Sequence, residues 1–425
     1  MENRQSWSSR LTFILAAVGS AVGLGNAWRF PGLASKHGGG AFLLVYLIAM
    51  LVFGVPLLMM EISIGRKLKK GAAPAMRGIN KKFEPIGWAA TANAFVIVCY
   101  YAVVFAWVIL MVFMSFKFAG MTGDTVAASN LFADTIETTW KVEDYGIPLI
   151  MIIPFLLAWG SIFYSIRNSA QSIGKVVKYI VFLPLIFLAI MAVKGLTMPG
   201  AMDGIQKLFV PDFAALKDPA IWIDAVGQVF YSLSVMMAIM FAYGSYLKDD
   251  SNIAVDAMII AFCDIGISIL AGVAMFSTMG GTGMLGNMTD SGIATAFIVY
   301  PQAIVSLSNS GVFNAIFGAV FYLCLVTLAI DSAFSIVEGV SASVADRFKL
   351  NPRKTTRNIV IVAAVISLVF ITRAGLAWLD IVDKWANAYN LIIVGILECI
   401  AIGWFFKPSK ILAEINRNTN NAKIG

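Results

Sequence analysis

Long apolar stretches alternate with shorter polar segments along the whole chain. A helix needs about 17–25 apolar residues to cross the roughly 30 Å hydrocarbon core of a bilayer. The pattern therefore predicts an all-α polytopic membrane protein with about ten transmembrane helices. The ten stretches are residues 11–35, 41–65, 88–119, 146–165, 171–193, 220–246, 254–280, 312–343, 358–374 and 377–404.

Two of these stretches are interrupted at their centres. In the first, Gly19, Gly23, Gly25 and Pro31 all weaken helix continuity. In the sixth, the sequence QVFYSLS at 228–234 is polar where a bilayer favours apolar side chains. Backbone groups freed inside a membrane cost several kcal/mol each unless they find a polar partner. Interrupted spans at corresponding positions of two halves are typical of a transporter binding site.

The composition supports a membrane protein and excludes several other classes. Apolar residues make up 59% of the chain and charged residues 13%, against about 45–50% and 25% in soluble domains. The four cysteines all lie in apolar stretches, which argues against a disulfide framework. With a single histidine, His37, which we expect to be a solvated loop residue, the chain has no Cys/His metal cluster. No nucleophile–base set and no cofactor motif is present, so we expect no enzymatic activity.

The net charge of +7 describes topology rather than a nucleic-acid partner. Of the 31 lysines and arginines, 22 fall in segments that alternate crossings place on one side of the membrane. Because cytoplasmic loops carry the excess of basic residues, the N-terminus is expected in the cytoplasm of a multi-pass plasma-membrane protein. The segments are 1–10, 66–87, 166–178, 247–253, 346–357 and 405–425.

Particular motifs resemble the neurotransmitter:sodium symporter family. The most specific is GSAVGLGNAWRFP at 19–31, followed by GGGAF at 38–42. The resemblance covers essentially the whole chain and is strongest to bacterial members that transport a range of hydrophobic amino acids. The further matching positions are Gly54-Val-Pro56, Glu61, Tyr100-Tyr101, residues 228–234, Ser245-Tyr246 and Ile330-Asp-Ser332.

This resemblance implies an inverted-repeat (5+5) transporter fold with unwound spans 1 and 6. Residues 1–425 would form a single transmembrane transporter domain, with a first repeat at 11–193, an inverted second repeat at 220–404 and a cytoplasmic tail at 405–425. Family members typically have eleven or twelve spans. With ten predicted spans, we expect either a truncated sequence or one that does without the last span.

The resemblance also implies two sodium sites. For the first Na+, the matching positions are Ala21, Asn26, Ser232 and Asp264, where the family commonly has Asn in place of Asp264. For the second, they are Gly19, Val22, Leu328, Asp331 and Ser332. An aspartate inside a membrane needs a partner, and a bound cation would supply one. A protonated Asp264 and a purely structural Asp331 remain the alternatives.

Chloride-dependent relatives bind the anion through positions that match Tyr46, Gln228, Ser232 and Ser268. Asp264 lies one helical turn before Ser268 and would supply a negative charge internally. We therefore expect chloride independence, with chloride an unlikely cofactor.

The substrate positions implied by the resemblance carry no charged side chain. Amine-transporting relatives have an Asp where this chain has Gly23, so the substrate should bring its own carboxylate, as an α-amino acid does. The apolar lining favours a hydrophobic side chain, and a methionine pair would tolerate several sizes unless it only packs against other helices. The positions are Ala21, Gly23, Gly25, Ile97, Tyr101, Tyr231, Ser232, Ser234, Met236, Met237, Ser332 and Ile336.

Two gates follow from the same resemblance. Arg29 and Asp383 match an outer ion pair, with Tyr231 as a lid. At the cytoplasmic end, Arg4 and Asp346 match an inner pair, with Trp7, Ser245 and Tyr246 around it.

The predicted function is sodium-coupled import of a hydrophobic L-amino acid by alternating access. A proton-coupled carrier of the same fold is the main alternative, with Asp264 and Asp331 taking protons instead of complementing Na+. A channel is disfavoured, because channels usually build a ring from symmetric subunits. A sensor is disfavoured as well, because the sequence has no soluble signalling domain.

Overall fold

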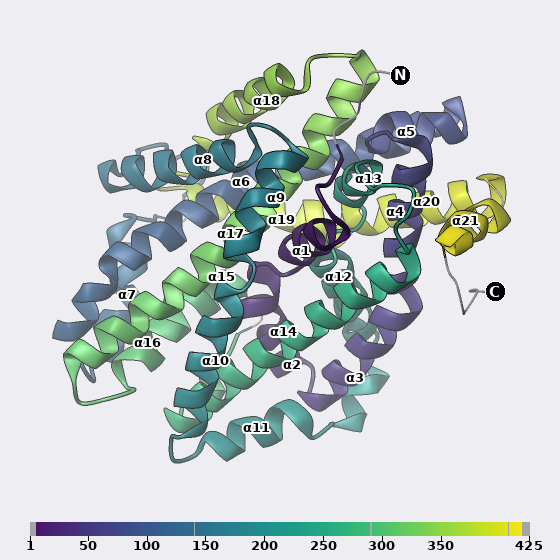
Figure 1. The fold of residues 1–425 in the computed structure, drawn as a ribbon. Coiled ribbons are helices and arrows are strands. Elements are labelled where there is room, and N and C mark those ends of the chain that lie inside the picture. Colours follow the sequence, from purple (N-terminus) through teal and green to yellow (C-terminus); the bar gives the residue numbers. More distant parts are fainter. Residues whose placement is uncertain (1–5, 140, 290, 407, 419–425) are drawn as a thin grey trace.

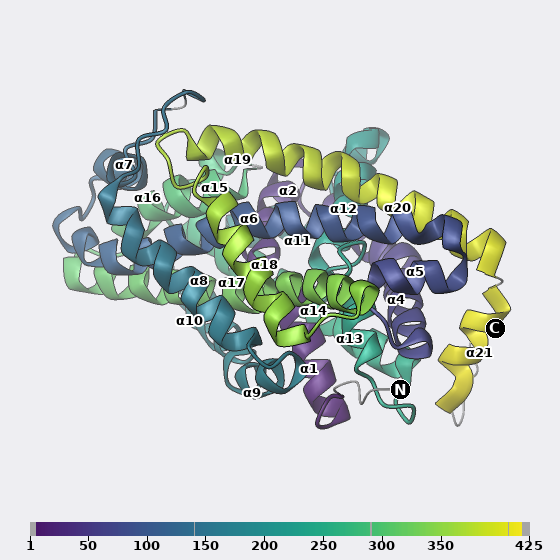
Figure 2. The same ribbon diagram turned by 90° about the horizontal axis from the view of Figure 1, so that it is seen from above.

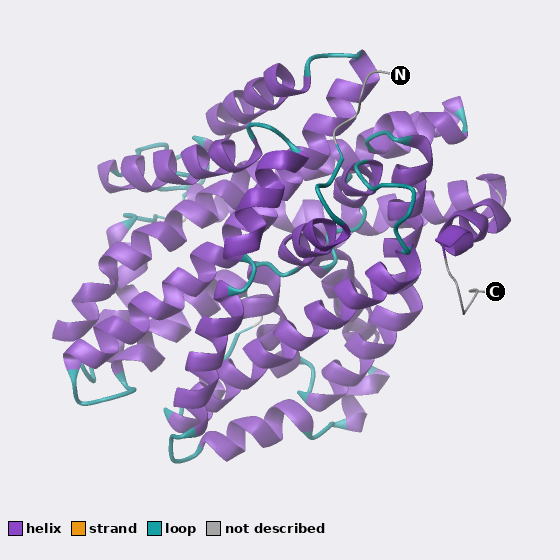
Figure 3. Ribbon diagram, viewed as in Figure 1, coloured by secondary structure: helices purple, strands orange, loops and turns teal. Residues whose placement is uncertain are grey.

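The computed structural model describes residues 6–139, 141–289, 291–406 and 408–418. Within these ranges the fold is helical and contains no β-strand (Figure 3). The first half of the chain contains α1 (Arg10–Ala21), α2 (Phe30–Lys36), α3 (Gly40–Ala49), α4 (Val55–Leu68), α5 (Ala72–Ile79), α6 (Glu84–Met114), α7 (Thr125–Thr135), α8 (Ile152–Ile166), α9 (Ala170–Ile180), α10 (Leu183–Leu196) and α11 (Ala201–Phe209).

The second half contains α12 (Pro219–Ser232), α13 (Ile239–Ser245), α14 (Ile253–Gly281), α15 (Gly292–Ala294), α16 (Tyr300–Val305), α17 (Gly311–Phe348), α18 (Pro352–Ser367), α19 (Gly375–Asp383), α20 (Leu391–Ile400) and α21 (Pro408–Ile415). Five segments are wider π-helical turns: η1 (Gly25–Arg29), η2 (Met50–Gly54), η8 (Thr295–Val299), η9 (Lys384–Asn390) and η10 (Ala401–Phe406). Short 3₁₀ turns complete the set: η3 (Lys81–Phe83), η4 (Ser115–Gly120), η5 (Leu149–Met151), η6 (Phe213–Lys217), η7 (Leu285–Asn287) and η11 (Asn416–Asn418).

The long helices α6 and α17 pack against each other through the centre of the molecule. Figures 1 and 2 show the other spans arranged around this pair, with α19 and α20 running along α6. The broken helix α1 packs against α17. The broken helix α12 packs against α20, which in turn packs against α6. Apolar side chains also cover much of the outer surface, as a protein in lipid requires.

Seven helices among the described residues are long and apolar enough to cross a membrane, and the bent pair formed by α1 and the helix over Gly25–Lys36 makes an eighth span. The two remaining predicted spans are shorter in the structure. Residues 220–246 are split into α12 and α13. The helix α18 covers only the first part of the predicted span 358–374, because it ends at Ser367. Eight of the ten predicted spans are thus helical over a membrane-crossing length among the described residues, counting the bent pair as one. The sixth is broken, as the sequence predicts, and the ninth is shorter than predicted.

The first and sixth spans break where the sequence is interrupted. The helix axis bends by 48° between α1 and the segment that begins at Gly25. In the sixth span, residues 233–238 separate α12 from α13, and Ser234, Met236 and Ala238 take left-handed φ angles of 55°, 62° and 62°. Left-handed backbone is uncommon for non-glycine residues and persists only where surrounding contacts enforce it, often at functional sites. The unwound segment forms here without any glycine.

The helices α4 and α13 approach each other closely at glycines. A Cβ added to Gly244 would lie 2.4 Å from the Ile62 carbonyl oxygen, and one added to Gly65 would lie 2.2 Å from that of Phe241. Small residues allow such close contact between membrane helices.

We expect Gly244→Val to lower the free energy of unfolding by about 1–3 kcal/mol, because the clash is with backbone and cannot be relieved by a side-chain rotation. Thermal unfolding of the purified protein in detergent would measure the effect. The control is Gly266→Val in α14, since Gly266 has no atom within 4 Å of its Cβ position. Equal melting temperatures for the two variants would contradict the close packing.

Candidate functional site

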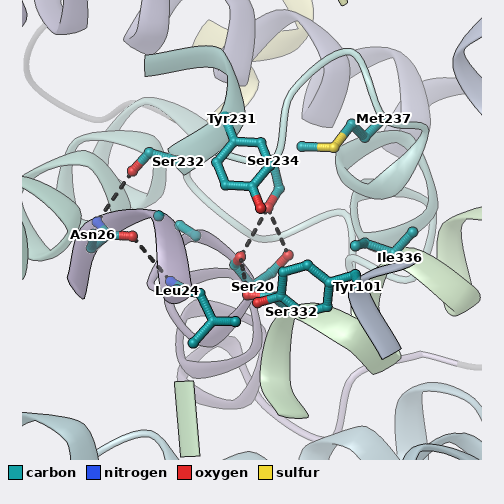
Figure 4. A pocket seen from close by; sticks show the side chains of 13 residues that line it. Ser20, Leu24, Asn26, Tyr101, Tyr231, Ser232, Ser234, Met237, Ser332 and Ile336 are labelled. Carbon is teal, nitrogen blue, oxygen red and sulfur yellow. Dashed lines mark hydrogen bonds between the residues drawn. The ribbon is translucent and has the colours of Figure 1, made fainter. Parts of the chain in front are cut away.

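The two broken spans meet at a small enclosed pocket between α1, α6, α12 and α17 (Figure 4). None of its lining residues is charged. Its volume is about 20 Å³, little more than one water molecule needs. The lining residues are Ser20, Ala21, Gly23, Leu24, Gly25, Asn26, Tyr101, Tyr231, Ser232, Ser234, Met237, Ser332 and Ile336.

Hydrogen bonds tie the two breaks together. The Ser234 hydroxyl donates to the Ser20 carbonyl at 2.9 Å, and the Ser20 hydroxyl contacts the Ser234 hydroxyl at 3.2 Å. The Ser332 hydroxyl of α17 reaches the same Ser20 carbonyl at 3.4 Å. Figure 4 shows these contacts on one side of the pocket and Met237 with Ile336 on another. The backbone freed by the broken helix α1 therefore has partners in both the sixth and the eighth span.

Glycine is required where the first span faces its neighbours. A Cβ on Gly23 would lie 2.5 Å from the Ser332 hydroxyl oxygen and 3.6 Å from that of Tyr101. A Cβ on Gly25 would lie 2.7 Å from the Tyr231 ring. Any larger side chain at these two positions would enter the pocket or push its wall outward.

Beside the pocket, a buried carboxylate accepts hydrogen bonds from three polar side chains. Asp264 of α14 accepts hydrogen bonds from the Ser232 hydroxyl at 2.6 Å, the Asn26 amide at 2.7 Å and the Tyr46 hydroxyl at 2.9 Å. The Ser268 hydroxyl accepts from the same Asn26 amide at 2.8 Å. Three of the four residues predicted for the first sodium site thus lie in mutual contact, and Ala21 lines the adjoining pocket.

Three of the four positions predicted to match a chloride site, Tyr46, Ser232 and Ser268, belong to the hydrogen-bond network of this carboxylate. Tyr46 bonds one Asp264 oxygen, and its hydroxyl lies 3.3 Å from that of Ser268. The Gln228 amide donates to the Gly25 carbonyl at 3.2 Å. Asp264 therefore lies among the hydroxyl groups at the positions predicted to match a chloride site.

A second buried carboxylate lies on the other side of the first break. Asp331 of α17 is 2% exposed, and its Oδ1 has no hydrogen-bond partner. A Cβ on Gly19 would lie 2.7 Å from its Oδ2, so the carboxylate touches the backbone of α1 directly. Val22 and Leu328 are both buried, and Ser332 follows Asp331. An unpaired carboxylate oxygen beside a broken helix suits a hard cation, which prefers carboxylate and carbonyl oxygens.

The Arg29–Asp383 gate is not a direct ion pair in this structure. The Arg29 guanidinium carbon lies 5.4 Å from the centre of the Tyr231 ring, and its Nη1 is buried without a hydrogen-bond partner. Asp383 instead accepts from the Tyr100 hydroxyl and the Asn387 amide, both at 2.7 Å. Tyr231 therefore lies between the pocket and the arginine, as a lid would.

At the N-terminal end, Trp7 is buried against the end of the sixth span. Its indole nitrogen donates to the Tyr243 carbonyl at 3.0 Å, and its ring meets those of Tyr243 and Tyr246 edge to face. The Asp346 carboxylate accepts from the backbone nitrogen of Gly71 at 2.7 Å. Arg4, the other predicted member of this gate, lies outside the described residues.

Ten of the twelve predicted substrate positions line the pocket, and two do not. Ile97 is buried in α6 one turn before Tyr101. The Met236 side chain packs towards Gly395 of α20, 3.6 Å from its Cβ position, so only Met237 of the pair faces the pocket. Ser20 and Leu24 line the pocket but were not among the predicted residues, although both belong to the glycine-rich motif.

The expectation of a solvated His37 is wrong. Its side chain is 5% exposed, stacks on Phe42 and lies 2.7 Å from Asp224 of α12. Lys36 contacts the same carboxylate at 3.3 Å. A partner 187 residues away in the sequence explains why the local loop pattern gave no sign of this burial.

Comparisons with known proteins agree with this geometry. The model of the sodium:neurotransmitter symporter family matches residues 4–124 and 121–423. An uncharacterised sodium-dependent transporter of Methanocaldococcus jannaschii is 37% identical, over 99% of this chain and 86% of the relative. The human sodium- and chloride-dependent GABA transporter 2 is 30% identical, over 97% of this chain and 75% of the relative.

Among solved structures, MhsT in complex with L-phenylalanine superposes with a TM-score of 0.84 at 28% identity, covering 97% of this chain and 93% of that one. This match confirms the predicted transporter fold with broken first and sixth spans. The family consists of transporters and not of enzymes, which confirms the predicted absence of catalysis. The chain belongs to the sodium:neurotransmitter symporter family.

Proposed function

We propose that this protein imports hydrophobic L-amino acids together with Na+ and without chloride. The observation that carries the proposal is a pocket with no charged lining residue that adjoins two buried carboxylates, Asp264 and Asp331. Such a pocket suits a solute that brings its own charges, and the carboxylates suit coupling cations. MhsT, the structural neighbour, was solved with L-phenylalanine.

The carboxylate and the amine of the substrate would lie at the helix ends created by the breaks in the first and sixth spans. The segments beginning at Gly25 and Ile239 point N-terminal backbone amides towards the breaks, which favours the substrate carboxylate. The carbonyl ends of α1 and α12 favour its amine. Tyr231, Met237 and Ile336 would then contact the side chain, and methionine adapts to several shapes.

Sodium would bind at two places, one bounded by Asn26, Ser232 and Asp264 and the other by Asp331 and the carbonyls of α1. At the first site, the substrate carboxylate would complete the ion's shell, so that each ligand binds poorly alone. Each Na+ that enters contributes about 2.3 kcal/mol per 100 mV of membrane potential, besides its concentration gradient.

The substrate must enlarge the pocket before it fits. A cavity of about 20 Å³ cannot take an amino acid, so Tyr231 and the unwound segment at 233–238 must move. Trp7 would close the N-terminal side, which the positive-inside pattern places in the cytoplasm. Opening the two sides in turn would give alternating access, with the repeats at 11–193 and 220–404 as its two halves.

Uptake into proteoliposomes tests the proposal. We expect labelled leucine to accumulate with an inward Na+ gradient and not with equimolar K+, and the uptake to persist when gluconate replaces chloride. Protein-free liposomes are the control. Equal uptake in Na+ and K+ would contradict sodium coupling, and loss of uptake in gluconate would contradict chloride independence.

Proton coupling is the second candidate, because both aspartates lie inside the membrane. This candidate predicts that leucine uptake is independent of Na+ and increases when the exterior of the liposomes is acidic. The same proteoliposomes, with a pH gradient in place of the sodium gradient, distinguish the two candidates.

A further inference from the structure

Two glutamates outside the pocket and the sodium sites form a buried pair. Glu61 of α4 and Glu398 of α20 are both 0% exposed and interact electrostatically. Three of their four carboxyl oxygens have no hydrogen-bond partner: Glu61 Oε2, Glu398 Oε1 and Glu398 Oε2. The fourth, Glu61 Oε1, accepts the backbone N–H of Met236 at 2.6 Å.

No cation among the described residues neutralises this pair. The electrostatic neighbours of the two carboxyls are each other and Cys399. Charged residues on the surrounding helices contact other ionisable partners. These contacts are Arg66 with Glu414, Glu84 with Arg77 and Arg347, Asp224 with His37, and Asp256 with Arg10. The helix α13 carries no charged residue.

Two carboxylates that interact in a dry membrane interior cannot both be ionised without a compensating cation, so one of them must be neutral. A metal ion needs further oxygen ligands, whereas the one group among the described residues that hydrogen-bonds these carboxyls is the N–H of Met236, which is a donor. A proton needs only the two carboxyls. We propose that Glu61 and Glu398 form a proton-binding site, distinct from the sodium sites, in which one of the two carboxyls is protonated in this conformation.

The pair is in contact with the unwound segment of the sixth span. The Glu61 carboxyl accepts a hydrogen bond from the backbone N–H of Met236. Met236 directly precedes Met237, which lines the pocket. One turn before Glu398, Gly395 lies against the Met236 side chain, 3.6 Å from its Cβ position. An ionised Glu61 would hold that N–H more strongly than a neutral one, because hydrogen bonds to charged groups are roughly twice as strong. Movement of α20 away from this segment would admit water, and the carboxyl would release its proton to that water.

Infrared spectroscopy of the purified protein in saturating NaCl tests the site without relying on transport. We expect a carbonyl stretching band of a protonated carboxyl at neutral pH in the wild type. Glu398→Gln and the double variant Glu61→Gln/Glu398→Gln should lose this band. The matched control, Glu414→Gln, should keep it, because Glu414 is an ion-paired partner of Arg66.

A wild type without the band, or a band unchanged in both glutamine variants, would overturn the proposal. A band that appears only when a bulky organic cation replaces Na+ would also overturn it, because a metal ion would then occupy the pair. If a variant fails to fold, absence of the band from the wild type would still overturn the proposal. Because the spectrum requires no substrate, a failed leucine-uptake experiment would leave this result standing.

Discussion

Replacing Asp331 by asparagine is expected to reduce sodium-driven leucine uptake to the level of protein-free liposomes. The amide keeps the size of the carboxylate and removes its charge, so a cation between α17 and the carbonyls of α1 would lose the counter-charge of Asp331. Breaking a buried charge pair costs about 3–5 kcal/mol. At 1.4 kcal/mol per factor of ten, sodium affinity should fall more than about 100-fold. Uptake as a function of Na+ concentration would measure the loss.

Binding must be separated from folding for this variant. Sodium should raise the melting temperature of the purified wild type and have a smaller effect on Asp331→Asn. Asp203→Asn, the same exchange at an exposed residue of α11, is the control and should match the wild type. A wild-type sodium dependence in Asp331→Asn would remove the second sodium site from the mechanism.

The sequence was sufficient to predict the breaks in the first and sixth spans. The reason is local, because Gly23 and Gly25 interrupt the first helix, and polar residues at 228–234 interrupt the sixth. Both signals lie in the segment that unwinds. The resemblance to the family then brought together Asn26, Ser232 and Asp264, which do form a contact network.

What the sequence could not provide depends on distant contacts and on backbone angles. The side chain of Met236 points away from the pocket because the backbone there is left-handed, and no glycine signals this conformation. The burial of His37 depends on Asp224, and the position of Arg29 depends on the Tyr231 ring. A local pattern indicates which residues are unusual, but not which distant residue each one meets.

Replacing Asp264 by asparagine is expected to make leucine uptake depend on chloride. The variant would leave the hydroxyls of Tyr46, Ser232 and Ser268 around a place that has lost its negative charge. Without a compensating anion, Na+ should bind less well. Charge-assisted hydrogen bonds contribute about 1.5–3 kcal/mol against about 1 kcal/mol for neutral ones, so we expect uptake in gluconate to fall about 10-fold. Uptake measured in chloride and in gluconate compares the two states.

Chloride should restore uptake in Asp264→Asn because the hydroxyls that now donate to the carboxylate would donate to the anion instead. The wild type should give equal rates in both media, since its carboxylate already accepts those hydrogen bonds. Adding Ser268→Ala to Asp264→Asn removes one donor and should abolish the rescue, which separates anion binding from a general effect of salt. If Asp264→Asn transports equally in chloride and gluconate, the charge of Asp264 does not substitute for an anion, and Asp264 serves only as an oxygen ligand and a hydrogen-bond acceptor.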